Sequence, residues 1–154
     1  MTEDRIKQES ELALKLFVVM SRANHAVMDR VKEDIKSHGL NPTEFAVLEL
    51  LFHKGDQPIQ QIGQRILLSS GSMTYVIDRL TGKKLLKRRP CPNDRRITYA
   101  TITDEGRALM QEVFPKHREA IRSMLSGLDK AEKQVMIDLL KKLGFSVENL
   151  SGTP

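Results

Sequence analysis

Residues 69–106 read SSGSMTYVIDRLTGKKLLKRRPCPNDRRITYATITDEG, and this stretch decides the fold. It opens with a Ser-Ser-Gly break that supplies a helix cap, and a helix is predicted to follow to about Lys84. The apolar positions of that helix recur at helical spacing: Met73, Val76, Ile77 and Leu80. Residues 85–89 and 97–102 favour strands, and the turn formers Pro90, Pro92, Asn93 and Asp94 separate them. The stretch therefore predicts a helix followed by a β-hairpin with a basic tip.

Two further short helices are predicted upstream of this stretch. Asn41-Pro42-Thr43-Glu44 has the pattern of a capping box with proline at the first helical position, and Gly55 should end the helix. Its expected buried side chains are Phe45, Leu48, Leu51 and Phe52. A second helix is expected from about Pro58 to Leu67, with Ile59, Ile62 and Ile66 inward. Helix, turn, helix and basic hairpin together predict a winged helix-turn-helix.

Longer helices flank this unit, and they suggest a second subunit. The helix predicted within residues 1–38 is apolar on nearly all faces, so another chain is the expected cover. Thr103-Asp104-Glu105 starts a long helix that Pro115 should kink, and a capping box at Asp129-Lys130-Ala131-Glu132 opens a last one, expected to stop at Gly144.

The predicted fold class is mainly α with a small β-hairpin wing. We divide it into an N-terminal dimerisation helix (residues 1–38), a DNA-binding lobe (40–103), C-terminal dimerisation helices (104–145) and a loose tail (146–154).

The positive charge of the chain is concentrated in one segment. Residues 83–96 hold seven lysines and arginines against one aspartate, a local charge of +6, whereas the other 18 cations and 19 anions nearly cancel. A charge run is often only a solvated face, but this asymmetry suits a polyanionic partner. Together with the predicted winged helix-turn-helix, this segment predicts double-stranded DNA as the partner.

Several other classes of protein are disfavoured. A single cysteine excludes an internal disulfide and fits the cytoplasm, no signal peptide is predicted, and the longest apolar run is too short to cross a membrane. None of the four histidines has a metal-ligand spacing, and no nucleophile is paired with a base, so we expect no cofactor, no metal and no enzyme.

The residues expected to contact DNA lie on the second helix of the pair and on the hairpin. The outward positions of the helix are Ser70, Ser72, Thr74, Tyr75, Asp78 and Arg79. Hydroxyl groups there can serve bases or phosphates, and Arg79 can reach a phosphate or a guanine. The hairpin contributes Arg88, Arg89, Arg95 and Arg96. The tip of the hairpin is suited to the minor groove. Asp94 is expected to pair with one guanidinium and hold the tip rigid while another enters the groove; alternatively, Asp94 only forms an Asx-turn.

The order of these features from Asn41 to Gly106 resembles the MarR family of bacterial regulators. The resemblance rests on Leu40-Asn41-Pro42-Thr43-Glu44-Phe45, Ser70-Gly71-Ser72-Met73-Thr74, Asp94-Arg95-Arg96 and Ile102-Thr103-Asp104-Glu105-Gly106. It implies a homodimer that represses from a pseudo-palindromic operator and is released by a small molecule or an oxidant. It also implies that Arg96 is the wing-tip arginine and Asp94 its partner. Tyr75 departs from the arginine of many relatives, so the operator sequence cannot be inferred.

Two features bear on the effector. Cys91 lies among arginines that should lower its pKa, so its oxidation can disturb the wing; the alternative is an exposed loop residue without a role. His25, with Phe17 and Met28 one or two turns away, can line an effector pocket, or the three can belong to the core. His117 is expected to be a satisfied interface histidine. Residues 38–45 with Pro90-Cys91-Pro92 also resemble, more loosely, the quinone- and phenol-responsive MhqR-like members of the family.

Two alternative functions remain open from the sequence. A winged-helix module can bind an acidic protein instead of DNA, but the Ser-rich helix and the aromatic content of 5% argue against such an interface. A nonspecific architectural DNA-binding protein is the other, and a footprint without sequence preference would identify it.

Overall fold

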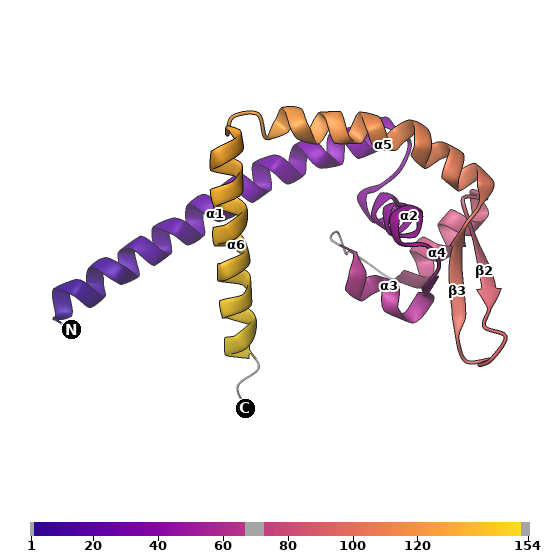
Figure 1. Cartoon of the computed structure of the whole chain (residues 1–154), viewed down its shortest axis with the longest axis horizontal. Coiled ribbons are helices and arrows are strands. Elements are labelled where there is room, and N and C mark those ends of the chain that lie inside the picture. Colours follow the sequence, from indigo (N-terminus) through magenta and orange to yellow (C-terminus); the bar gives the residue numbers. More distant parts are fainter. Residues whose placement is uncertain (1, 67–72, 152–154) are drawn as a thin grey trace. The chain divides into compact units, whose positions relative to one another are not determined.

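The computed structural model describes residues 2–66 and 73–151, with only the backbone of residue 151 (Figure 1). Its elements are α1 (Glu3–Ser37), α2 (Pro42–Lys54), β1 (Gln57–Pro58), α3 (Ile59–Arg65), α4 (Met73–Gly82), β2 (Leu86–Pro90), β3 (Thr98–Ile102), α5 (Asp104–Met124) and α6 (Lys130–Ser151). They form two compact units, residues 1–120 and 121–154. The first unit contains the winged helix-turn-helix.

The capping box predicted at the start of α2 is present. The Asn41 side chain accepts a hydrogen bond from the backbone N–H of Glu44 at 2.8 Å, and the Glu44 carboxylate accepts one from the backbone N–H of Asn41 at 3.1 Å. Gly55 ends the helix with a φ of +79°, a conformation that glycine adopts without steric cost. α2 buries Phe45, Leu48 and Leu51 as expected.

The predicted hairpin is part of a three-stranded antiparallel sheet in the order β1-β3-β2. β2 pairs with β3 from Leu86 opposite Ile102 to Pro90 opposite Thr98. β1, which was not predicted, pairs Gln57 with Ala100. The sequence showed no periodicity for β1 because it has only two residues, and its Pro58 had been assigned to the start of the next helix. That helix, α3, begins one residue later, at Ile59.

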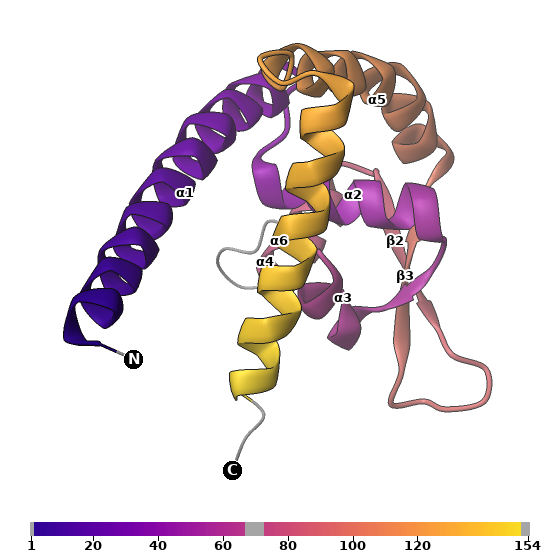
Figure 2. The ribbon, with the colours of Figure 1, turned by 60° about the vertical axis from the view of Figure 1, so that its left-hand side comes forward.

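α4 packs its apolar stripe into the core of the first unit. Val76, Ile77 and Leu80 are buried as predicted, and Met73 is half-buried. In Figure 2 the β2–β3 hairpin extends past α2 and α3, so its loop projects from the helices of this unit. α4 and the wing are thus parts of the same folded unit, and Asp78 of α4 pairs with Arg88 of β2.

The Thr103-to-Gly106 motif joins the sheet to α5. The Thr103 hydroxyl donates to the carbonyl oxygen of Lys84 at 2.7 Å and accepts from the N–H of Gly106 at 3.0 Å, so it caps the helix. A Cβ atom at position 106 would overlap the carbonyl oxygen of Leu85 and lie 2.9 Å from Cγ1 of Ile102. Glycine is required there because the backbone of the segment before β2 passes so close. α5 then continues through Pro115 to Met124.

α1 is one helix of 35 residues that leaves most of its apolar side chains uncovered. Only Val31 and Ile35 are buried. Its exposed large apolar residues are Ile6, Leu12, Leu14, Leu16, Phe17, Val18 and Val19. The predicted helix is therefore present, and its apolar surface is available to another chain.

α6 begins as predicted but ends later. Asp129 and Glu132 form the expected capping box, with hydrogen bonds of 2.9 and 3.0 Å. The prediction of a stop at Gly144 and a loose tail over residues 146–154 is wrong for residues 146–151, because the helix continues to Ser151. A glycine inside a helix costs only about 1 kcal/mol relative to alanine, and no proline follows it within the helix. Val135, Leu139 and Leu143, which recur at helical spacing, are exposed within this chain.

Candidate nucleic-acid interface

The exposed face of α4 carries four of the side chains predicted to contact DNA. Thr74, Tyr75, Asp78 and Arg79 are all exposed. Ser70 and Ser72, predicted for the same surface, lie outside the described residues. The described part of α4 thus offers a hydroxyl, a phenol, a carboxylate and a guanidinium to a ligand.

Tyr75 and Arg79 form a pair on this face. Nη1 of Arg79 donates a hydrogen bond to the Tyr75 hydroxyl at 3.2 Å, and the guanidinium carbon lies 5.8 Å from the centroid of the Tyr75 ring. Nε of Arg79 lies 4.0 Å from the Glu44 carboxylate. The hydrogen bond to Tyr75, followed by the charge of Glu44, raises the pKa of Arg79 above its usual value. The Glu44 carboxylate of α2 therefore helps to hold the Tyr75–Arg79 pair in place.

Glu44 connects the start of α2 with the end of α4. Its carboxylate is buried and lies 2.7 Å from Nζ of Lys83, which follows α4 directly. A buried carboxylate is costly unless it is paired, and Glu44 is paired with Lys83 and hydrogen-bonded to Asn41. The sequence pattern predicts for Glu44 only a role in the capping box. No local pattern signals the contact with Lys83, since the two residues are far apart in the chain.

Arg88 and Arg89, both predicted to contact DNA, anchor the base of the wing. Arg88 pairs with Asp78 of α4 at 2.5 Å, and Arg89 pairs with Asp56 at 3.2 Å. The guanidinium of Arg89 also lies 4.8 Å from the centroid of the Tyr99 ring. Each arginine thus links β2 to a neighbouring segment, and its charge is partly balanced by a carboxylate.

The tip of the wing contains the Asp94–Arg96 pair. The Asp94 carboxylate accepts two hydrogen bonds from the Arg96 guanidinium, both at 3.1 Å, and one from the Arg96 backbone N–H at 3.0 Å. The last contact has the geometry of an Asx-turn, which is present in addition to the predicted pair with a guanidinium. The guanidinium contact, followed by the backbone one, lowers the pKa of Asp94. Arg96 is nevertheless 90% exposed, so its side chain is oriented without being covered.

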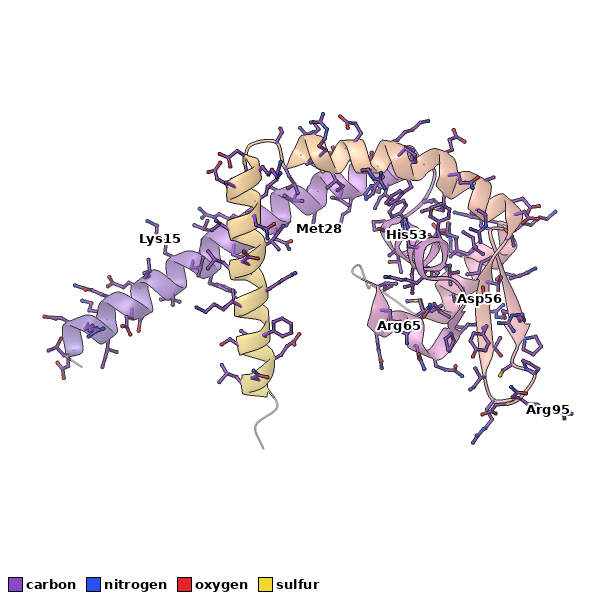
Figure 3. The ribbon with its side chains drawn as sticks, in the orientation of Figure 1. Lys15, Met28, His53, Asp56, Arg65 and Arg95 are labelled. Carbon is purple, nitrogen blue, oxygen red and sulfur yellow. The ribbon has the colours of Figure 1, made fainter. Side chains whose placement is uncertain are left out.

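Arg95 also lies at the tip of the wing, and Gln60 contacts the tip from α3. Arg95 is exposed and points away from the hairpin loop (Figure 3), and no carboxylate pairs with it among residues 2–66 and 73–151. Nε2 of Gln60, on α3, donates to the carbonyl oxygen of Arg96 at 3.2 Å. Gln60 was not predicted as part of this surface. Its contact ties the loop of the wing to the helix-turn-helix.

The residues suggested for sensing lie in two places. Cys91 is half-buried in the wing, and its backbone N–H donates to the carbonyl oxygen of Ile97 at 3.0 Å. Phe17 and His25 are exposed on α1, where His25 lies 3.4 Å from Asp29, and Met28 is half-buried (Figure 3). A single chain therefore does not bury Phe17 or His25 in a core.

His117 is buried where α5, α1 and α2 meet. Its Nδ1 lies 2.8 Å from the Asp34 carboxylate, and its ring centroid lies 4.6 Å from that of Phe45. His38 Nε2 lies 3.5 Å from the same carboxylate. His117 is thus satisfied as predicted, by Asp34 of the same chain, and its place at an interface between subunits stays a prediction.

Two features that mark other classes of protein are absent from the described residues. No group of histidine, cysteine, aspartate and glutamate side chains in that part of the chain is arranged to hold a metal ion. No helix among the same residues combines the length and the apolar character needed to span a bilayer.

Comparison with known proteins identifies the family. Residues 40–98 match the model of the MarR family. The chain is 51% identical to the HTH-type transcriptional regulator MhqR of Bacillus subtilis, over 90% of this chain and 96% of that one. Among solved structures, it resembles Bordetella bronchiseptica BpsR (28% identity, TM-score 0.73, 84% and 98% of the two chains) and reduced AbfR bound to DNA (26%, 0.69, 92% and 98%). The chain belongs to the MarR family of winged helix-turn-helix transcriptional regulators.

Proposed function

We propose that this chain is a cytoplasmic repressor that binds a pseudo-palindromic operator as a homodimer and is released by a small phenolic or quinone-like ligand or an oxidant. The single observation that carries the DNA-binding part is the wing tip. Arg96 is almost fully exposed, yet the Asp94 carboxylate fixes its direction through the two guanidinium contacts. An arginine that is oriented before binding loses less conformational freedom when it enters a narrow minor groove.

The exposed face of α4 supports the same proposal. In a helix-turn-helix, the second helix lies in the major groove and its polar side chains reach base edges. Thr74, Tyr75 and Arg79 are exposed there, and the wing is anchored to the same helix through Arg88 and Asp78. A helix for the major groove and a tip for the minor groove are thus parts of one folded unit.

The homodimer is supported by apolar surface that a single chain leaves uncovered. On α1 this surface includes Leu12, Leu16 and Phe17, and on α6 it includes Val135, Leu139 and Phe145. An exposed row of large apolar side chains along a helix marks an interaction site, and each of these two helices carries one. A second copy would cover it and would present a second wing, and two α4 helices about 34 Å apart would match successive turns of the duplex.

Release by a ligand is supported by the relatives. The structure of BpsR concerns regulation of its DNA binding by 6-hydroxynicotinic acid, a hydroxylated aromatic compound. In this chain, Phe17, His25 and Met28 are candidates to line such a pocket once a second subunit covers α1. A ligand that binds only a dimer with mismatched α4 spacing would shift the population away from the DNA-bound form.

Fluorescence anisotropy with DNA from upstream of the chain's own gene tests the proposal. We expect tight, sequence-specific binding, with Arg96→Ala weakening it by about tenfold and lowering the slope of log K against log salt by about one. Lys116→Ala is the matched control, because it removes one exposed positive charge outside the wing. Binding without sequence preference would favour an architectural protein. A monomer indifferent to double-stranded DNA would refute the proposal.

The ligand part needs a separate measurement. The same anisotropy assay, repeated with phenols, quinones and peroxides, should show release of the operator by at least one of these classes. If none of them changes the affinity, the phenolic, quinone or oxidant effector is wrong and DNA binding stands by itself.

A further inference from the structure

We propose that Tyr75 selects a thymine in the major groove, and that Arg79 positions it for this role. This inference rests on the proposed operator binding. Tyr75 lies in the first turn of α4 as described, its ring is 60% exposed, and it is one of only two tyrosines in the chain. Residues near the start of a recognition helix are those that reach base edges.

The hydrogen bond between the two side chains decides which group Tyr75 offers to DNA. Arg79 donates through Nη1, so the Tyr75 hydroxyl oxygen acts as the acceptor. The hydroxyl hydrogen is not used in this contact, and a tyrosine hydroxyl has one hydrogen to donate. Tyr75 therefore presents a hydrogen-bond donor at the end of an apolar ring.

Thymine is the base whose major-groove edge matches this combination. It offers an acceptor, O4, beside an apolar C5-methyl group. Cytosine offers an amino donor, which a donor cannot pair with, and guanine offers acceptors without a methyl group. A donor with an apolar ring edge should therefore favour a T·A pair.

Arg79 is itself held in place, so it can act as a positioning residue. Its Nε lies 4.0 Å from the buried carboxylate of Glu44, and its Nη1 contacts Tyr75. An aromatic side chain has only two rotatable bonds, and a contact that restricts them before binding reduces the entropy lost on association. The neighbouring Asp78 carboxylate is paired with Arg88, which reduces its repulsion of the DNA backbone.

Two modified bases separate the two parts of the contact. Replacing each thymine of one half-site in turn by deoxyuridine removes only the methyl group, and replacing it by 5-methylcytosine, paired with guanine, keeps the methyl group but exchanges the acceptor for a donor. At one thymine we expect a loss of about fourfold for deoxyuridine, the value of one buried methyl group. For 5-methylcytosine we expect about tenfold.

For each variant we compare the affinity for the unmodified operator with the affinity for each modified operator. The ratio of the two affinities is the measured quantity. Tyr75→Phe keeps the ring and should retain the deoxyuridine loss but abolish the discrimination against 5-methylcytosine. Arg79→Met should reduce both ratios, because the ring is no longer held. Tyr99→Phe is the matched control: Tyr99 also lies against an arginine, Arg89, but on β3, and its ratios should equal those of the wild type.

Other results would overturn the inference. If Tyr75→Phe weakens binding to all operators by one factor, the hydroxyl contacts a phosphate and reads no base. If no thymine is sensitive to loss of its methyl group in the wild type, Tyr75 does not select thymine. In both cases sequence-specific binding that Arg96→Ala weakens would still support the proposed function. If the wild type does not distinguish operator from unrelated DNA, both the function and this inference fail.

Discussion

The carboxylate of Glu44 lies 2.7 Å from Nζ of Lys83, although 39 residues separate the two in the chain and Glu44 is only 1% exposed. One side chain therefore both caps α2 and fastens the C-terminal end of α4 to it. This ion pair helps to fix the orientation of α4 relative to α2. The orientation of α4 matters because this helix carries the face proposed to read DNA. Removing one partner of a buried pair costs more than removing an exposed pair.

Glu44→Ala should lower the free energy of unfolding by about 2–4 kcal/mol, since the cap and the partner of Lys83 are lost together. Glu44→Gln should cost only about 1 kcal/mol, because glutamine can still complete the capping box. Urea denaturation at one fixed protein concentration measures both. Glu112→Ala is the control, because its carboxylate is exposed and contacts only Lys116 among the salt bridges of the described residues. Equal stability of Glu44→Ala and Glu112→Ala would contradict the role of Glu44.

The features that the sequence predicted correctly depend on neighbours in the chain. Both capping boxes, Asn41 with Glu44 and Asp129 with Glu132, join residues three positions apart. The Asp94–Arg96 contact spans two positions. In each case the residue types and their spacing nearly determine the geometry, so the pattern was sufficient.

The features that it missed depend on tertiary contacts. β1 forms because Gln57 pairs with Ala100, which lies far along the chain. A strand of two residues is too short to show an alternating pattern in the sequence. The contact of Gln60 with the Arg96 carbonyl oxygen likewise follows from the packing of α3 against the wing. α6 passed the expected stop at Gly144 because one glycine is a weak terminator without a proline nearby.

Asp94 should titrate below its ordinary pKa of 3.8, because the guanidinium and the backbone N–H of Arg96 stabilise the carboxylate. A group whose pKa is lowered by folding adds stability above its unfolded pKa and loses it as the pH falls through the folded value. The tip should therefore remain ordered from pH 8 to about pH 5 and loosen only in stronger acid. Carboxyl NMR titration of Asp94 measures this, and Arg96→Ala should return the pKa towards its ordinary value. An unchanged pKa in that variant would show that the pair does not persist in solution.

Gly106→Ala should destabilise the lobe by about 1–3 kcal/mol, because the added Cβ would overlap the Leu85 carbonyl oxygen and press on Ile102. Gly63→Ala is the matched control inside α3. Apart from its chain neighbours and the nearby backbone of its own helix, no described atom lies within 4 Å of its added Cβ, and alanine favours a helix over glycine by about 1 kcal/mol. Thermal unfolding at equal protein concentration should thus move in opposite directions for the two variants. A neutral Gly106→Ala would mean that β2 and α5 are not packed as closely as described.

Cys91→Ser should bind the operator as tightly as the wild type and should still be released by a phenolic or quinone-like ligand. The sequence placed the thiol among four arginines, but three of them are paired: Arg88 with Asp78, Arg89 with Asp56 and Arg96 with Asp94. Each of these three arginines therefore already has a carboxylate partner.

Because the chain has a single cysteine, this one substitution removes all of its thiol chemistry and separates a bound ligand from covalent modification. The measurement is operator release, followed by anisotropy, for wild type and Cys91→Ser with quinones, with phenols that cannot alkylate thiols, and with peroxide. Release by both aromatic classes in the variant indicates a noncovalent site. Loss of the quinone response in the variant alone would instead make Cys91 the sensor, since the thiol would then be the group that the quinone modifies.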